Sequence, residues 1–175
     1  MKKMMLLLAL MVGTGILAAG CSRTAEPDAA VSTSTPTAQE AADMSTEALV
    51  EAVLTSPEIV HLRLYNTYRS GVENFARHSP VAAELLARPD NAAALLNAYQ
   101  DTSPPRSGES AADTAAIERL DVLGILLAQP EVTANMDDGL RAEMEQAAAE
   151  KDAELETAAS PLNTYREAEA ELADS

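Results

Sequence analysis

From residue 45 onward, hydrophobic positions recur every three to four residues in segments that proline separates, which is the period of amphipathic α-helices. Ser45 is a suitable N-cap for the first segment. A proline in the first turn of a helix is harmless, because its missing N–H has no partner there anyway. Further helices are therefore predicted to begin at Pro57, Ser79-Pro80, Pro89, Pro130 and Ser160-Pro161, and another follows a loop at 101–110.

Two of the predicted helices are long. The helix from Pro57 continues through Phe75, with Gly71 weakening its middle, and its apolar positions are Val60, Leu64, Tyr65, Tyr68, Val72 and Phe75. The helix from Pro130 carries Val132, Met136, Leu140, Met144, Ala148 and Leu155. The shorter helices carry Leu49, Val50, Val53 and Leu54; Val81, Leu85 and Leu86; Leu95, Leu96 and Tyr99; and Ile117, Leu120, Leu123 and Leu127.

Composition supports helices over strands. Hydrophobic residues make up 47% of the 175 residues, but aromatic residues only 3%, with four Tyr, one Phe and no Trp. Alanine favours helices because it loses no side-chain entropy there, whereas strands are enriched in aromatic and β-branched residues. The sequence predicts one all-α domain of five to seven helices, either a small helical bundle or a degenerate array of helical hairpins.

The hairpin array is suggested by a pattern that occurs three times. Leu54-x-x-Pro57-Glu58, Leu86-x-x-Pro89-Asp90 and Leu127-x-x-Pro130-Glu131 each read Leu-x-x-Pro-acid. In each, leucine closes an apolar face, proline fixes the first turn, and the acid faces the positive helix N-terminus. The spacing is irregular, so a shared way of joining short helices is favoured over a true repeat.

The chain is strongly acidic, with a net charge of −16. Such a surface repels phosphate backbones and offers no polybasic attraction to anionic lipids, which argues against nucleic acid as a partner. Residues 61–88 hold four arginines against two glutamates, while thirteen acids follow from Glu131 onward. These segments are expected to face each other inside the fold; the alternative is an Arg-bearing face that meets an acidic partner.

The N-terminus has the layout of a secretory signal. Met1-Lys2-Lys3 is a short positive region, and an apolar run from Met4 to Leu17 leads to Ala18, Ala19, Gly20 and Cys21. The run is at the short limit for a spanning helix, and no basic cluster follows it. The sequence therefore predicts export and removal of residues 1–20.

Leu17-Ala18-Ala19-Gly20-Cys21 resembles the lipobox of bacterial lipoproteins, with Ala18 where leucine is commoner; the resemblance covers only residues 1–21. It implies lipidation of Cys21, cleavage between Gly20 and Cys21, and a lipid-anchored protein of the cell envelope. Ser22 is compatible with transfer to the outer membrane, facing the periplasm, in a Gram-negative host. An ordinary cleaved signal, which would leave Cys21 as a free thiol, and an uncut signal anchor are the alternatives.

Residues 21–44 are predicted to be a lipidated cysteine and a disordered tether, because Ser, Thr, Ala, Pro and Asp dominate without an apolar period. This length would hold the domain roughly 25–30 Å from its anchor. Residues 45–175 form the predicted acidic helical domain. Loss of Lys2 and Lys3 leaves 10 basic against 28 acidic residues in the mature chain, so its charge is −18. The lipid is therefore the evident membrane attachment.

No arrangement of residues predicts catalysis or metal binding. His61 and His78 lie too far apart for a local metal-ligand motif, and Cys21 is the single cysteine. Motifs for nucleophilic catalysis and phosphate-binding loops are missing. Asn135-Met-Asp-Asp138-Gly139 lacks the alternating ligands of a calcium loop and is expected on an exposed helix face.

We therefore expect a non-catalytic binding or scaffolding module without a cofactor or metal, held at the membrane through lipid on Cys21, with an envelope protein as its partner. A small-ligand binder is the alternative, and an enzyme is a weaker one. The candidate ligand or partner surface is formed by Tyr65, Tyr68, Arg69 and Tyr99. A pocket between helices lined by the three tyrosines would favour the small ligand.

Overall fold

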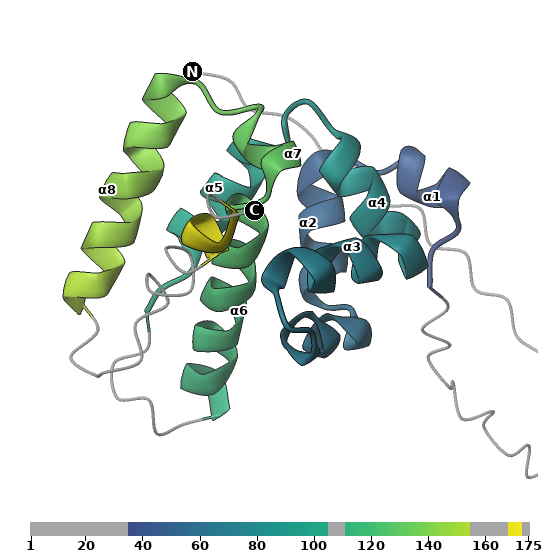
Figure 1. Cartoon of the computed structure of the whole chain (residues 1–175), viewed down its shortest axis with the longest axis horizontal. Coiled ribbons are helices and arrows are strands. Elements are labelled where there is room, and N and C mark those ends of the chain that lie inside the picture. Colours follow the sequence, from purple (N-terminus) through teal and green to yellow (C-terminus); the bar gives the residue numbers. More distant parts are fainter. Residues whose placement is uncertain (1–34, 105–110, 155–167, 173–175) are drawn as a thin grey trace, which may run out of the picture. The chain divides into compact units, whose positions relative to one another are not determined.

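The computed structural model describes residues 35–104, 111–154 and 168–172, which are helical without any β-strand (Figure 1). The all-α prediction is confirmed for this part of the chain. In order, the elements are α1 (Ala38–Ala42), α2 (Thr46–Leu54), the 3-10 helix η1 (Pro57–Leu64), α3 (Tyr68–His78), α4 (Pro80–Ala87), α5 (Asn91–Asp101), α6 (Ala111–Leu127), α7 (Pro130–Thr133) and α8 (Asp138–Glu154). Residues 168–172 are also helical.

Each helix from α1 to α4 has a serine or threonine as its N-cap. A hydroxyl at the N-cap accepts a hydrogen bond from a backbone N–H that has no partner inside the helix. Ser45 caps α2 as predicted, by accepting from the N–H of Ala48 at 3.2 Å. The same role falls to Thr37 before α1, Ser56 before η1, Thr67 before α3 and Ser79 before α4.

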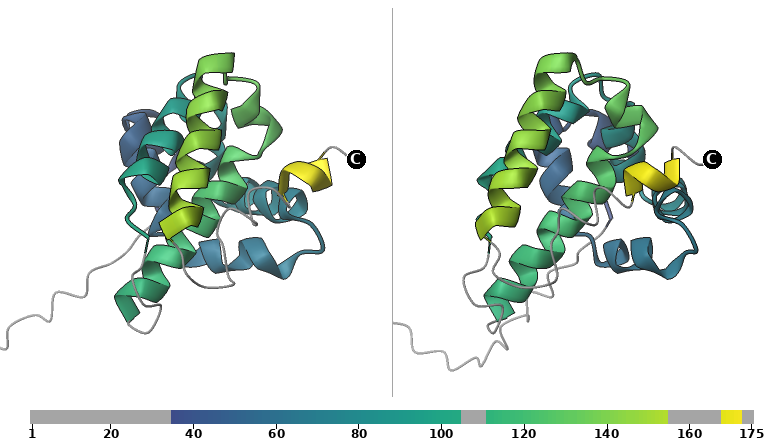
Figure 2. Two further views of the ribbon diagram at one scale, coloured as in Figure 1. Left: turned by 90° about the vertical axis from the view of Figure 1, so that its left-hand side faces the viewer. Right: turned by 60° about the vertical axis from the view of Figure 1, so that its left-hand side comes forward.

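Helix α5 lies at the centre of the packing. It contacts α2, α4, α6, α7 and α8, so helices from both halves of the described chain pack against it (Figure 2). Leucine and alanine fill the core, as the aromatic-poor composition requires, and Phe75 and Tyr99 are its aromatic members among the described residues. The largest fully buried side chains include Leu49, Leu85, Leu95, Leu96, Tyr99, Leu120, Leu123 and Met144.

The helical domain begins earlier than residue 45, which corrects the predicted tether boundary. α1 lies inside the predicted tether, and Thr37 and Glu40 form a capping box at its start. Ala41 is completely buried, and α1 packs against α4. The Arg88 guanidinium donates to the carbonyls of Ala42 at 2.8 Å and Met44 at 3.1 Å. Because α1 buries a single alanine, its sequence shows no apolar period, and the pattern of hydrophobic residues did not predict this helix. Residues 21–34 of the predicted tether lie outside the described residues.

The single helix predicted from Pro57 to Phe75 is wrong, because the segment forms η1 and then α3. Thr67 caps a new helix start between them, by accepting from the N–H of Ser70 at 3.1 Å. A 3-10 helix has three residues per turn, so side chains three apart share a face. Ile59 and Leu62 accordingly face the core, and Leu62 is only 1% exposed. Val60 and Leu64, which a 3.6-residue period places in the core, point outward.

Gly71 is the reason that η1 and α3 can pack closely. A Cβ atom at this position would lie 2.3 Å from the carbonyl oxygen of Leu62, which is closer than atoms can approach. Gly71 is buried in α3, and the Leu62 backbone occupies the space that a side chain at position 71 would fill. It is therefore a packing requirement of the fold rather than the weak middle of a long helix.

The predicted helix from Pro130 through Leu155 is also interrupted. α7 is a single turn, and α8 begins again at Asp138. The Asp137 carboxylate accepts from the N–H of Leu140 at 2.8 Å, which is the bond of a helix N-cap. The expectation that Asn135 to Gly139 form one exposed helix face is therefore wrong: this stretch ends one helix and caps the next. Leu155, and the start predicted at Ser160-Pro161, lie outside the described residues.

The three Leu-x-x-Pro-acid sequences mark helix starts but are not followed by equivalent units. Pro57 and Pro130 occupy first-turn positions, whereas Pro89 precedes α5, which begins at Asn91. The elements that follow are a 3-10 helix of 8 residues, an α-helix of 11 and an α-helix of 4. This agrees with the favoured interpretation, a shared connection rather than a structural repeat.

Replacement of Gly71 by alanine is expected to destabilise the fold by about 1–3 kcal/mol, because the new methyl group must displace the Leu62 backbone. In an ordinary helix interior the same change stabilises by roughly 1 kcal/mol. Urea unfolding followed by circular dichroism measures the difference. Gly139→Ala is the control, since its Cβ would meet only the Asp137 carboxylate, at 3.3 Å. Equal stability of Gly71→Ala and the unmodified chain would contradict the role of Gly71.

Candidate binding surface

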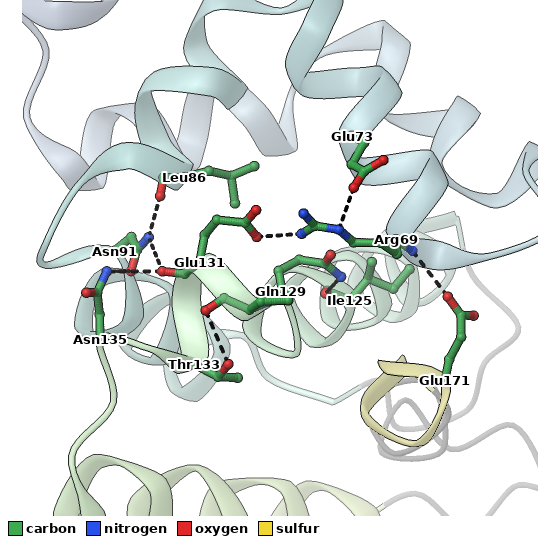
Figure 3. A network of polar contacts seen from close by, with 11 residues as sticks. Arg69, Glu73, Leu86, Asn91, Ile125, Gln129, Glu131, Thr133, Asn135 and Glu171 are labelled. Atoms are coloured by element: carbon green, nitrogen blue, oxygen red, sulfur yellow. Dashed lines mark hydrogen bonds and ion pairs between the residues drawn. The ribbon is translucent and has the colours of Figure 1, made fainter. Parts of the chain in front are cut away.

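Arg69, near the start of α3, connects three parts of the fold (Figure 3). Its guanidinium donates to Glu73 at 2.7 Å within α3 and to Glu131 of α7 at 2.6 Å. The carboxylate of Glu171, in the C-terminal helix at residues 168–172, accepts from the backbone N–H groups of Tyr68 at 3.2 Å and Arg69 at 3.3 Å. The first turn of α3 is thus held to α7 and to the C-terminal helix.

The ion pair between Arg69 and Glu131 changes the pKa of both groups. The hydrogen bond from Arg69 lowers the pKa of the Glu131 carboxyl, and the same bond raises the pKa of Arg69. Both groups are therefore charged at neutral pH. Because the side chains of Arg69 and Glu131 remain 30% and 40% exposed, solvent screens the pair, and its net contribution is at most about 1 kcal/mol. The pair orients α7 against α3 rather than dominating stability.

Beside this pair, two asparagines bind the backbone where the chain turns around α7 (Figure 3). The fully buried Asn91 amide donates to the carbonyls of Leu86 at 3.1 Å and Glu131 at 3.4 Å. Its side-chain oxygen accepts from the Asn135 amide at 3.0 Å. These bonds satisfy carbonyls that a short helix cannot pair internally, so the network fixes the position of Glu131 opposite Arg69.

The exposed apolar side chains gather on one element next to this network. Among the described residues, the large hydrophobic side chains classed as exposed are Val60 at 65%, Leu64 at 71% and Tyr65 at 41%. All three belong to η1 or the residue directly after it. We call residues 57–68 the η1 surface. The Arg63 side chain bridges this surface to Asp121 of α6, and that ion pair helps to hold η1 in place.

Three hollows adjoin the η1 surface. The first, of about 230 Å³, lies between η1 and α6 and is lined by Ile59, Val60, Leu62, Arg63, Glu118 and Val122. The second, of about 410 Å³, lies between η1 and α3 and is lined by Glu58, His61, Tyr65, Asn74, Phe75 and His78. The third, of about 290 Å³, is lined by Arg63, Tyr65, Asn66, Thr67, Tyr68 and Glu171. The exposed apolar side chains of the η1 surface are thus bordered by three hollows.

Of the four residues predicted to form a ligand or partner surface, Tyr65 and Tyr68 line the same hollow. Arg69 follows directly in α3, but its guanidinium pairs with Glu73 and Glu131 instead of lining that hollow. Tyr99 is wrongly placed by the prediction, because it is fully buried in α5, where Lys151 lies over its ring at 5.7 Å. Its apolar period in α5 indicated the core, and that signal was the correct one. The pocket lined by three tyrosines is therefore not formed.

The sequence did not identify Val60 and Leu64 as members of this surface, nor Glu171 as a residue beside it. Val60 and Leu64 were listed only among the apolar positions of one long α-helix. The three-residue spacing of Ile59 and Leu62 was the available signal for a 3-10 helix, but it also fits an α-helix. Glu171 is one of many acids, and it meets Tyr68 from 103 positions away in the chain, so no local pattern marks it.

The two histidines line the hollow between η1 and α3, both with exposed side chains. As expected for a residue near a helix end, the His78 ring shares a hydrogen bond of 2.9 Å with the carbonyl of Asn74. Within residues 35–104, 111–154 and 168–172, no three His, Cys, Asp or Glu side chains come close enough to hold a metal ion.

The expected balance between the Arg-bearing segment and the acidic C-terminal half is confirmed at Arg69, whose guanidinium pairs with Glu131. Arg63 instead pairs with Asp121 of α6, and Arg88 pairs within its own segment with Glu84 at 2.8 Å. These arginines are engaged within the fold.

The predicted cleavage and lipidation positions, Gly20 and Cys21, lie outside the described residues. In the part of the chain that the structure describes, no helix is both long enough and apolar enough to cross a membrane. Comparisons with protein-family models, curated proteins and solved structures gave no match. The function proposed below therefore rests on the residues of this chain.

Replacement of Asn91 by alanine is expected to destabilise the fold by on the order of 2 kcal/mol, because the carbonyl of Leu86 loses its side-chain donor and the carbonyl of Glu131 loses one of two, the other being the Asn135 amide. Asn97→Ala is a matched control on the exposed face of the same helix, and its effect should stay within about 0.5 kcal/mol. Thermal and urea unfolding of both variants measure the effects. Similar stabilities for the two variants would show that the Asn91 network does not support α7.

Proposed function

We propose that this protein is a lipid-anchored envelope protein with a non-catalytic binding or scaffolding role, and that the η1 surface is its contact with a partner protein. The observation that carries the contact is the exposure of Val60, Leu64 and Tyr65 together on one element. Clustered apolar side chains on an otherwise charged surface are typical of interaction sites. Burying a valine or leucine side chain contributes roughly 1.5–3 kcal/mol, so Val60 and Leu64 gain the most from a partner.

The anchor is supported by the lipobox-like sequence that ends at Cys21, the single cysteine of the chain. One acyl chain gives marginal membrane binding, and two or more give stable attachment, so lipidation of Cys21 is a sufficient anchor. The mature charge of −18 supplies no electrostatic attraction to anionic headgroups. We place the protein in the cell envelope, and at the outer membrane facing the periplasm if the host is Gram-negative, because Ser22 follows the cysteine.

A small ligand is the second candidate, and the hollow of about 410 Å³ between η1 and α3 is the observation that favours it. Its volume falls in the usual range of ligand sites, and His61, Tyr65 and His78 offer polar groups beside the apolar ring of Phe75. We favour a protein partner because the most exposed side chains, Val60 and Leu64, do not line this hollow. Their apolar surface needs a larger contact than a small molecule in the hollow provides.

Replacement of Cys21 by alanine is expected to abolish incorporation of labelled fatty acid and to accumulate the uncut precursor, because the thiol is the acceptor of the lipid. Metabolic labelling and membrane fractionation measure both effects. Ser22→Ala is the control next to it and should be lipidated and processed normally. Unchanged lipid labelling and processing of Cys21→Ala would rule out the anchor.

A photo-crosslinking amino acid at position 64 is expected to capture a specific partner in the native envelope, whereas the same probe at Glu145 should not. Glu145 is an exposed residue of α8, far in sequence from η1. In a companion variant, Val60→Asp combined with Leu64→Asp should lower partner recovery about tenfold or more with little change in stability, because both side chains are exposed. The absence of a specific crosslink at position 64 would count against the η1 surface.

A further inference from the structure

Arg77 differs from the other arginines of residues 61–88, which pair with carboxylates of the fold. It lies in the last turn of α3 with an exposed side chain. Within the described residues, no carboxylate lies close enough to form an ion pair with it. The helix dipole favours a positive charge in this turn but does not neutralise it. The Arg77 guanidinium is therefore available to a carboxylate from outside the fold.

Arg77 adjoins the hollow of about 410 Å³ between η1 and α3. Asn74 and His78 of α3 line this hollow, and Glu58 and His61 line it from η1. Side chains three residues apart are neighbours on the surface of a helix, so Arg77 flanks the hollow beside Asn74. One acid and two histidines of the hollow thus lie next to the Arg77 guanidinium.

This hollow is continuous with the exposed apolar side chains of the η1 surface. His61 and Tyr65, which line the hollow, follow Val60 and Leu64 directly in the chain. Tyr65 belongs to both features, since it is also one of the exposed apolar residues. A partner that covers Val60 and Leu64 therefore comes within reach of the groups that border the hollow.

The charge of α3 differs from that of the helices around it. α3 carries Arg69 and Arg77 against Glu73, and η1 balances Arg63 with Glu58. Among the described helices α1, α2 and α4 to α8, each holds more acids than bases. An acidic partner segment is therefore repelled least by α3 and η1. Such complementarity of charge selects a partner and its orientation more than it adds affinity.

We propose that the partner segment which docks on the η1 surface is acidic as well as apolar. Its apolar side chains cover Val60 and Leu64, and its carboxylates lie at the Arg77 end of α3, where the histidines of the hollow offer further donors. The Glu171 carboxylate already occupies the Tyr68 end of α3, which disfavours a second negative charge there. The inference rests on the function proposed above, because it names the chemistry of the partner at that same surface.

The first experiment identifies the segment on the full-length lipidated protein in its native envelope. A photo-crosslinking amino acid at position 64 captures the partner, and mass spectrometry of the digested crosslink identifies the attached residues. We expect a segment of another protein that carries Asp or Glu within a few residues of the attachment point. A segment without acids, a lipid, or a second copy of this chain at the crosslink would overturn the inference.

The second experiment measures the dissociation constant of that segment, made as a labelled peptide, on the lipidated protein in detergent micelles by fluorescence anisotropy. Arg77→Gln should weaken binding about two- to fivefold, which is the range of an exposed ion pair. Arg77→Lys keeps the charge and should restore most of the affinity. Glu58→Gln removes a negative charge beside the same site and should tighten binding by up to about twofold. Glu145→Gln changes the net charge equally, on the exposed face of α8, and should leave the dissociation constant unchanged.

The effects of the Arg77 and Glu58 variants should nearly vanish at about 1 M salt, where the Debye length is about 3 Å. A loss of affinity in Arg77→Gln that is equal at low and high salt would indicate a structural role at the end of α3 and overturn the inference. Equal affinities of Arg77→Gln and the unmodified chain at low salt would also overturn it. Capture at position 64 would then still support the binding function, because the apolar contact there does not require Arg77. No specific capture at position 64 would overturn both.

Discussion

A side chain at position 71 would place its Cβ atom 2.3 Å from the carbonyl oxygen of Leu62, so α3 can pack against η1 only because residue 71 is glycine. η1 runs from Pro57 to Leu64, and α3 begins anew at Tyr68 and packs back against it. In η1 the chain adopts three residues per turn, which directs Ile59 and Leu62 inward and leaves Val60 and Leu64 outside. The apolar edge that we propose as a contact surface is therefore held against α3 by a packing that only glycine permits at position 71.

The polar network around Arg69 holds that edge in position. Arg69 reaches α7 through Glu131, and Glu131 is in turn placed by the asparagines that bind its backbone carbonyl. The ion pair is partly exposed and weak, but the Asn91 amide is fully buried and has no solvent to replace its partners, so Asn91 is the more demanding part of the network. Glu171 adds the C-terminal helix to the same end of α3. The site that we propose for binding is thus also a point where distant parts of the chain meet.

The proposed anchor would localise the protein, and the proposed contact surface would recognise its partner. The lipid on Cys21 would hold the domain near a membrane that its acidic surface does not attract. Exposed apolar side chains on η1 would then supply short-range affinity for a partner, which a tether makes effective by keeping the domain at a high local concentration.

The sequence by itself determined the helical class, several helix starts and the acidic surface. Alanine-rich periodic segments and Ser or Pro at their starts are local signals, so Ser45, Ser79-Pro80 and the helix through Leu120 and Leu123 were predicted correctly. Tyr65 and Tyr68, which are near each other in the chain, line one hollow.

Tertiary packing alone decided the rest. α3 packs back on η1 where Gly71 approaches Leu62, and the short α1 packs against α4. At the interruption between α7 and α8, the Asn135 amide donates to the distant carbonyl of Arg88. Tyr99 was predicted on a binding surface but is buried, and Leu64 fits an apolar period but is exposed. Both positions satisfy such a period, so only the packed neighbours distinguish them. Glu171 reaches α3 across 103 positions, and a contact of that separation leaves no mark in the local sequence.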